Sequence, residues 1–274
     1  MANDPPVFFL RDSNDTYRAT EWTRGPWSRE HQHGGPPSAL LAHAIERLVP
    51  HEFDVARVTV EFLRPVPISA VRVAARVVRD GRSVRSVDAT LVCVDDGREL
   101  CRATGLAIRR APTGIALPAI DRPALPYALP SECPEWTFPF FAEPVAYHHA
   151  MELRFARGDF GHGPAVAWMR MRGALVAGES PSPLERAMCA ADSGNGVGVV
   201  LDVTRYTFVN PDLTVCLSRP LSGDWICLDS QTVPWPSGIG LAESALWDGV
   251  GLVGRAAQSL VVAERAREEL GPRF

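Results

Sequence analysis

The sequence predicts an α+β protein made of two similar units in tandem, each with one helix followed by antiparallel strands. Three observations predict this fold. A helical pattern followed by strand-like segments occurs twice, a proline-rich stretch separates the two occurrences, and short motifs recur at a nearly constant offset. With 274 residues, of which 46% are apolar and 22% charged, the chain can bury a substantial core.

The first unit, residues 1–110, is expected to contain one helix and a meander of strands. Gly35-Pro36-Pro37-Ser38 precedes apolar residues at helical spacing, and proline suits a first helical turn. Segments rich in β-branched residues follow, with Asp80-Gly81 and Asp96-Gly97 as hairpin signals between neighbours. The expected strands are 55–63, 71–79, 83–94 and 99–109. This order implies a curved sheet wrapped around a helix.

The second unit, residues 145–274, repeats this order after a proline-rich linker, residues 111–144. Prolines every few residues fit neither a helix nor a central strand, so the linker is expected to be extended and packed along a surface. A helix is expected from Ser182 to Gly194. The expected strands are 150–155, 165–171, 202–217, 225–233, 238–246 and 251–263.

Recurring motifs support a duplication. Phe62-Leu63-Arg64-Pro65 matches Leu217-Ser218-Arg219-Pro220 at an offset of 219 − 64 = 155 residues. Asp96-Gly97 matches Asp248-Gly249 at an offset of 248 − 96 = 152 residues. A period this long indicates gene duplication rather than a solenoid of short repeats.

The charge and composition exclude several classes of function. The 28 basic and 32 acidic residues leave a net charge of −4, so no basic surplus is present to bind nucleic acid. All 28 basic residues are arginine, which excludes Schiff-base lysines and Walker-type phosphate loops. The N-terminus does not resemble a signal peptide and no run approaches the ~18 apolar residues of a membrane span, so a cytoplasmic location is expected.

The cysteines and histidines do not predict a metal site. No CxxC pair or HExxH motif occurs, and no cofactor is implied. The cysteines are expected to be reduced and mostly in the core, because they lie in apolar segments of a chain without an export signal. They are Cys93, Cys101, Cys133, Cys189, Cys216 and Cys227.

A helix cradled by a curved antiparallel sheet and repeated in one chain resembles the double hotdog fold of the type II acyl-CoA thioesterases. His33-Gly34-Gly35 resembles the Gly-Gly motif that begins the family's hotdog helix. A series of motifs in the second unit follows the family's C-terminal signature in order and at nearly its spacing. These motifs are Asn210-Pro211-Asp212-Leu213, Arg219-Pro220, Trp225, Asp248-Gly249 and Gln258.

The resemblance implies hydrolysis of fatty acyl-CoA to a free fatty acid and CoA by direct attack of water, without a metal or a covalent intermediate. Matched by position, Asp212 is the expected base and Gln258 the amide that fixes the water. Thr232 is the expected hydroxyl, with Ser230 as the alternative. The family often has an acid where Asp192 ends the second helix, but a capping and turn role is expected for that residue.

The resemblance also implies an oxyanion site, an acyl-CoA partner and a homo-oligomer, of which a dimer is the simplest. Gly34 and Gly35 are the expected oxyanion donors, because glycine permits close approach and a helix N-terminus carries positive potential. Arginines could hold the phosphates of CoA. The candidates are Arg24, Arg29, Arg64, Arg219 and Arg255.

The proposed acid and amide occur in only one unit. The offsets of 155 and 153 residues place Arg57 opposite Asp212 and Gly105 opposite Gln258. This difference predicts a single working site, carried by the second unit.

Two alternatives remain. One is a hotdog hydratase or dehydratase of enoyl thioesters, which would need a histidine paired with an aspartate, and no such pair is evident near Gly35 or Ser182. The other is a non-catalytic acyl-CoA binding protein. An α/β-hydrolase thioesterase is disfavoured because no GxSxG motif occurs.

Overall fold

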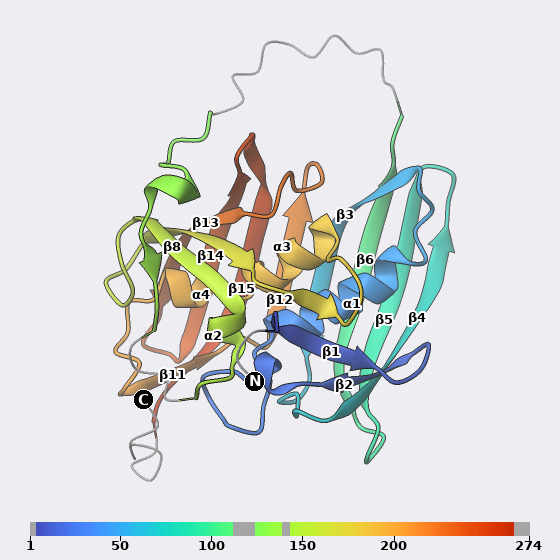
Figure 1. The fold of residues 1–274 in the computed structure, drawn as a ribbon, viewed down its shortest axis with the longest axis horizontal. Helices are drawn as coiled ribbons and strands as arrows, with labels where there is room; N and C mark the ends of the chain where they lie inside the picture. The colour runs from blue at the N-terminus through green and yellow to red at the C-terminus, as the bar shows by residue number, and fades with distance from the viewer. Residues whose placement is uncertain (1–3, 112–123, 139–142, 266–274) are drawn as a thin grey trace.

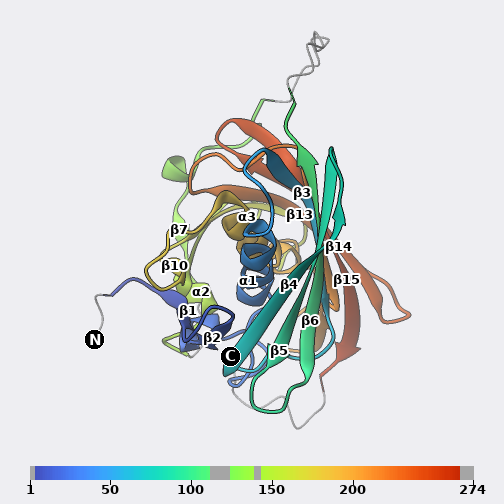
Figure 2. The same ribbon diagram turned by 90° about the vertical axis from the view of Figure 1, so that its right-hand side faces the viewer.

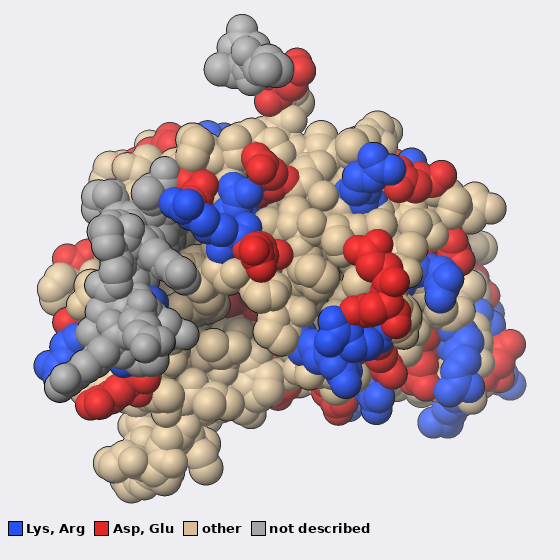
Figure 3. All heavy atoms as spheres, turned by 90° about the horizontal axis from the view of Figure 1, so that it is seen from below, with Lys and Arg blue, Asp and Glu red and all other residues tan. Residues whose placement is uncertain are grey.

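The protein is described here by a computed structural model, which describes residues 4–111, 124–138 and 143–265. Figure 1 shows the two halves side by side, with helices lying against one curved, largely antiparallel sheet. The α+β double hotdog fold is therefore confirmed. No helix among the described residues is long and apolar enough to cross a membrane. Arginine and acidic side chains are interspersed over the face shown in Figure 3.

The two halves contribute equivalent strands to the sheet. Outward from the centre, the order is β3-β6-β5-β4 in one direction and β12-β15-β14-β13 in the other. The first set is β3 (Phe53–Phe62), β4 (Ala70–Asp80), β5 (Val84–Cys93) and β6 (Glu99–Arg109). The second set is β12 (Asp212–Leu217), β13 (Ile226–Pro234), β14 (Ile239–Asp248) and β15 (Gly251–Glu264).

The central pairing of β3 with β12 lies on the axis that relates the halves. Thr59 and Thr214, which are 155 residues apart, are direct partners in the ladder, and the Thr214 hydroxyl donates to Thr59 Oγ1 at 3.2 Å. The flanking pair Arg57 and Cys216 is related to the pair Asp212 and Glu61 by the same offset. The two halves are thus structurally equivalent at the offset of 155 residues found in the motifs.

The two long helices pack against each other inside the curved sheet. They are α1 (Gly35–Glu46) and α3 (Pro183–Ala191). Figure 2 shows them enclosed by the curved sheet, which continues past β4 into the short strands β2 (Thr16–Ala19), β1 (Val7–Arg11) and β10 (Ala174–Val176). Leu40, Leu41 and Ile45 of α1 are fully buried, as expected for a helix covered on all sides.

The second helix starts at a capping box. The Ser182 hydroxyl accepts from the Glu185 N–H, and the Glu185 carboxylate accepts from the Ser182 N–H, both at 3.1 Å. Proline follows at the first helical position. The smaller elements are α2 (Tyr147–Ala150), α4 (Gly194–Val197), the 3-10 turns Glu21–Thr23 and Pro130–Glu132, and strands β7 (Glu135–Trp136), β8 (Met151–Arg157), β9 (Ala165–Met171) and β11 (Tyr206–Val209).

Some expected elements differ from those observed. The single strand expected over 202–217 is two strands, β11 and β12, because Pro211 has no N–H with which to continue the ladder. Strands β1, β2 and β10 have no counterpart in the sequence prediction. They are three to five residues long, and β1 pairs with β10 from the other half of the chain.

The linker expected over 111–144 is described only in part, since 112–123 and 139–142 lie outside the described residues. Its described part packs on the second half: the Trp168 indole N–H donates to the Ala128 carbonyl at 2.8 Å, and the Tyr127 hydroxyl donates to Asp229 at 2.5 Å. The six cysteines are unpaired, and five are buried, whereas Cys216 is exposed.

The fully buried carboxylate of Asp248 joins two loops of the second half, the one after β12 and the one between β14 and β15. Arg219 donates to both oxygens of Asp248, at 2.5 and 2.7 Å, and the N–H groups of Ser222, Val250 and Gly251 donate at 2.8 to 3.1 Å. Burial raises the pKa of Asp248, but the hydrogen bonds from Arg219, Ser222 and Val250 outweigh it, so the pKa is lowered overall.

We expect Asp248→Asn to lower the free energy of unfolding at neutral pH by about 3 kcal/mol, because it breaks a buried ion pair. A carboxyl whose folded-state pKa is lowered stabilises the protein above its unfolded pKa, near ~4, and this contribution is lost as the pH falls through the folded-state pKa. The difference between wild type and variant in urea unfolding should therefore shrink below about pH 4. The exposed Asp96→Asn serves as the matched control from the first half. A difference in free energy of unfolding between wild type and Asp248→Asn that does not change with pH would contradict a stabilising role of the ionised carboxylate.

Candidate active site

A cavity of about 500 Å³ lies between the two halves and is lined by residues of both. Most of its lining is apolar, from aromatic rings, methionines and aliphatic side chains. The ends of the helices and the break between β11 and β12 add a small polar group. The apolar lining includes Trp27, Phe62, Phe138, Met151, Phe155, Phe160, Met169 and Phe208. A mostly apolar cavity with a few convergent polar groups is the usual form of a small-molecule site.

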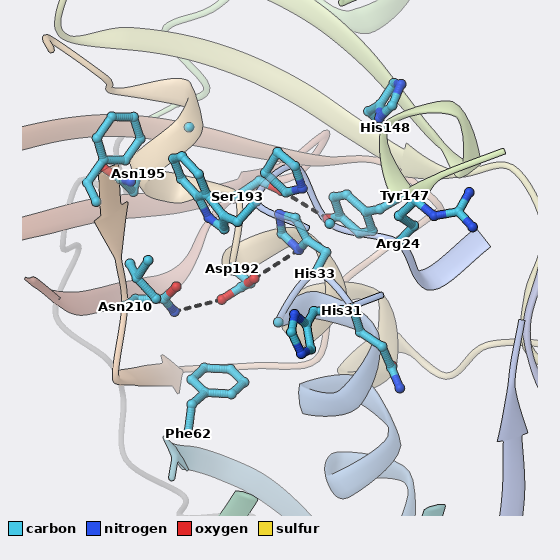
Figure 4. A pocket seen from close by; sticks show the side chains of 18 of the residues that line it. Arg24, His31, His33, Phe62, Tyr147, His148, Asp192, Ser193, Asn195 and Asn210 are labelled. Atoms are coloured by element: carbon cyan, nitrogen blue, oxygen red, sulfur yellow. Dashed lines mark hydrogen bonds and ion pairs between the residues drawn. The ribbon is translucent and has the colours of Figure 1, made fainter. Parts of the chain in front are cut away.

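Asp192 is the centre of the polar group. It follows the last residue of α3 and is buried, with 6% of its surface exposed. Its Oδ1 accepts from the Asn210 amide at 2.8 Å and from the Gln258 amide at 3.2 Å, and its Oδ2 lies 2.9 Å from His33 Nδ1. Figure 4 shows His33 and Asn210 approaching the carboxylate from different sides.

Local structure explains how three distant segments reach Asp192. Pro211 separates β11 from β12, and the Asn210 side chain at this break lies on the cavity wall. Gln258 is a buried residue of β15 that also donates to the Asp192 carbonyl at 3.1 Å. His33 precedes α1 and comes from the first half of the chain.

The His33 ring is held by a stack as well as by Asp192. It lies parallel to the Tyr147 ring, with centroids 3.8 Å apart. The Tyr147 hydroxyl donates to the Cys189 carbonyl at 2.8 Å and lies 2.9 Å from the Ser193 hydroxyl. Among the described residues, no hydrogen bond to His33 Nε2 is present, while Nδ1 is also 3.1 Å from the Gly35 N–H.

His148 also lines the cavity but carries no charge at neutral pH. Burial, followed by repulsion from His149 and His33, lowers the pKa of His148 to about 3. Among the described residues, no group of three His, Cys, Asp or Glu side chains is arranged to hold a metal ion.

The structure brings two of the three expected catalytic residues together. Thr232 donates to the Asn195 side-chain oxygen at 3.1 Å, and the Asn195 N–H donates to the Gln258 side-chain oxygen at 3.1 Å. Asn195 lines the cavity, and Thr232 lies behind it. The alternative hydroxyl, Ser230, instead lies 2.7 Å from the Ser244 hydroxyl.

Asp212 does not join this group. Its carboxylate accepts from the Ser259 N–H at 2.7 Å, and Asp212 is not part of the cavity lining. Among the described residues, no hydrogen bond joins the Asp212 side chain to Gln258 or Thr232. The break at Pro211 accounts for this, because Asn210 ends on the cavity side while Asp212 already lies in the ladder between β3 and β15.

The two glycines have different surroundings. A Cβ on Gly34 would lie 2.8 Å from Asp192 Oδ2 and 2.8 Å from the Phe62 ring, so Gly34 is pressed against the carboxylate. A Cβ on Gly35 would lie 2.4 Å from the Cys189 carbonyl, so Gly35 allows α1 to approach the end of α3. Only Gly34 lines the cavity.

The structure corrects one expectation directly. No histidine–aspartate pair was expected near Gly35, but His33 and Asp192 form one. The pair joins residues 192 − 33 = 159 positions apart in different halves, so no sequence spacing could reveal it. The only available signal was a histidine beside the Gly-Gly motif and an acid at the end of the second helix.

The fold and the site together define a double hotdog protein with one polar centre in an apolar cavity. The family model of the acyl-CoA thioesterase N-terminal domain matches residues 23–109, and that of the C-terminal domain matches residues 130–262. The chain therefore belongs to the acyl-CoA thioesterase family.

Solved structures share this fold over nearly the whole chain. A provisionally assigned thioesterase II from Thermobifida fusca is 18% identical, with 93% of this chain and 95% of that chain covered and a TM-score of 0.71. A hot dog protein of unknown function from Alicyclobacillus acidocaldarius is 17% identical, with 94% and 96% covered and a TM-score of 0.70. Acyl-CoA thioesterase II from Mycobacterium marinum is 16% identical, with 94% and 96% covered and a TM-score of 0.66. No curated protein sequence matches.

We expect Gly35→Ala to lower the free energy of unfolding by about 1 to 3 kcal/mol, because the added methyl group must push α1 away from the Cys189 carbonyl. Gly249→Ala is the matched control, since its Cβ would meet nothing within 4 Å, and a change within ~0.5 kcal/mol is expected. Urea unfolding of both variants provides the measurement. Equal free energies of unfolding for Gly35→Ala and Gly249→Ala would show that the fold does not require the close approach of α1 to the Cys189 carbonyl.

Proposed function

We propose that this protein hydrolyses acyl-CoA thioesters to a carboxylic acid and CoA. The observation that carries the proposal is the Asp192 carboxylate on the wall of an apolar cavity, in contact with His33, Asn210 and Gln258. Membership of the acyl-CoA thioesterase family supports the reaction class. The apolar lining suits a fatty acyl chain.

His33 is the proposed general base. One nitrogen cannot both donate to a carboxylate and accept from an amide, so His33 Nδ1 serves either Asp192 or Gly35. The amides of Asn210 and Gln258 complement a negative charge on Asp192, which favours a proton on Nδ1. The basic lone pair then lies on Nε2, and Asp192 holds the ring in this tautomer.

The reaction needs one proton transfer in each direction. His33 Nε2 accepts a proton from water as its oxygen bonds to the thioester carbonyl carbon. The carbon–sulfur bond of the resulting tetrahedral intermediate then breaks, and the thiolate leaves as CoA. The proton on His33 returns to the thiolate, so the side chain ends in its starting state.

The Gly34 N–H is the proposed oxyanion donor. It lies at the N-terminus of α1, next to Asp192, and has no hydrogen-bond partner among the described residues. The Gly35 N–H is directed at His33 Nδ1. A backbone N–H at a helix start is well suited to a developing negative charge.

In this scheme the essential carboxylate is Asp192 rather than Asp212. Asp192 orients the base, His33, and does not itself accept the proton of water. Gln258 keeps the role of a positioning amide, now on Asp192 rather than on the water. Thr232 supports Asn195, which in turn orients Gln258.

The His33–Asp192 pair also favours a second candidate, hydration of an enoyl thioester. The same base could deliver water to a carbon–carbon double bond instead of the carbonyl carbon. Two assays separate the candidates: thiol release from an acyl-CoA series from acetyl to palmitoyl, and loss of ultraviolet absorbance from crotonyl-CoA. We expect thiol release with saturated acyl chains. Loss of absorbance without thiol release would favour the hydratase.

We expect Asp192→Asn to lower kcat/KM for acyl-CoA hydrolysis by about 100-fold or more, because the substitution removes the charge that orients the base. Asp212→Asn is the matched control, since among the described residues that carboxylate accepts only the Ser259 N–H, and it should stay within about threefold of wild type. Circular dichroism and thermal unfolding would verify that both variants fold. Retained activity in Asp192→Asn, with loss in Asp212→Asn, would reverse the assignment.

A further inference from the structure

We propose that Arg64 binds a phosphate group of the CoA moiety of the substrate, an inference that rests on the proposed thioester hydrolysis. Arg64 lines the cavity, and its side chain is exposed to solvent. Because this chain has no lysine, a permanently charged side chain that binds phosphate must be an arginine.

Comparison of the two halves distinguishes Arg64 from its counterpart. Arg219, 155 residues later, donates from both terminal nitrogens to the buried carboxylate of Asp248. The residue that matches Asp248 in the first half is Asp96, which pairs with Arg98 rather than with Arg64. Both halves thus have the arginine and the aspartate, but among the described residues the two form an ion pair only in the second half.

The donors of Arg64 are largely unused. Its guanidinium donates to the Glu99 carbonyl at 2.8 Å, and no carboxylate lies within 4.0 Å of it among the described residues. A guanidinium has five N–H donors in a planar fork that matches phosphate oxygens. Most of these donors therefore stay available to a ligand at the cavity.

The other arginine in the cavity lining, Arg24, already forms ion pairs and hydrogen bonds within the protein. Arg24 forms ion pairs with Glu21 at 3.1 Å and Glu143 at 3.6 Å, and it donates to the carbonyls of Arg29 and Val145. Its side chain is only 12% exposed. Arg64 is consequently the better placed of the two to meet an incoming anion.

The chain also links Arg64 to the polar centre. Phe62 lies two residues earlier, and its ring is close enough to Gly34 that a Cβ there would clash with it. Two residues of chain span at most ~7 Å, so the Arg64 backbone lies near the polar centre, while its side chain is exposed at the cavity lining. The pantetheine arm of CoA separates the sulfur from the phosphates in the same way, with the sulfur inside and the phosphates outside.

The test compares wild type, Arg64→Gln and Arg76→Gln on three substrates with the same acyl group. Arg76 is an exposed arginine of β4 outside the cavity lining, so its substitution controls for loss of one positive charge. Acyl-CoA carries all the phosphates, the acyl-phosphopantetheine thioester carries one, and the acyl-N-acetylcysteamine thioester carries none.

For acyl-CoA, we expect Arg64→Gln to raise KM about 10-fold with kcat within about twofold of wild type. For acyl-N-acetylcysteamine, kcat/KM should match wild type. A raised KM for acyl-phosphopantetheine would assign the contact to the phosphate next to pantetheine, and an unchanged one to the phosphates of the nucleotide end. Equal losses on the phosphate-free substrate, or an unchanged KM for acyl-CoA, would overturn the proposal.

Binding of free CoA separates this proposal from the proposed function. If the wild type hydrolyses none of the three thioesters, the proposed function fails, and calorimetry with CoA still tests Arg64. A Kd raised about 10-fold in Arg64→Gln, but not in Arg76→Gln, would support the phosphate contact. Equal Kd values in all three proteins would overturn it.

Discussion

The buried carboxylate of Asp192 is the constraint on which the arrangement of the site depends. A carboxylate removed from water is costly unless hydrogen-bond donors surround it. Here those donors come from three separate segments: His33 before α1, Asn210 at the break between strands, and Gln258 on β15. Gly34 has no side chain, and a Cβ at this position would lie 2.8 Å from Asp192 Oδ2. Satisfying Asp192 therefore brings together segments of both halves.

Equivalent positions of the two halves differ in the residue that faces the helices, and this difference accounts for the polar group around Asp192. In the ladders, Thr59 pairs with Thr104 and Thr214 with Ala257, so Gly105 and Gln258 occupy equivalent places one residue further along. A Cβ on Gly105 would lie 2.5 Å from the Ile45 side chain, so in the first half a core residue of α1 fills this space. In the second half the space holds Gln258 and the end of α3. One half thus uses the position for packing and the other for a hydrogen bond to Asp192.

Local signals predicted the fold well, and the site only in part. Helix α1 and the long strands were predictable because their apolar periodicity and Asp-Gly turns act over a few residues. Gln258 and the His33-Gly34-Gly35 motif were also found from the sequence, and both contact Asp192 or lie beside it. Asp192 is the C-cap of α3, as the sequence predicts, but its side-chain contacts could not be predicted because the partners are distant in sequence. Asp212 matches the family's spacing, but it lies after the break at Pro211 and outside the cavity lining. The sequence does not show on which side of such a break a side chain lies.

The role of Asp192 is tested most directly by the tautomer of His33, since the proposed mechanism needs a proton on Nδ1 and a lone pair on Nε2. Nitrogen-15 NMR of ring-labelled protein measures this, with the His33 signals assigned by their loss in His33→Gln. In the neutral ring, the proposed mechanism predicts a protonated Nδ1 and an unprotonated Nε2, with this preference lost in Asp192→Asn. A neutral ring protonated on Nε2 in the wild type would contradict it.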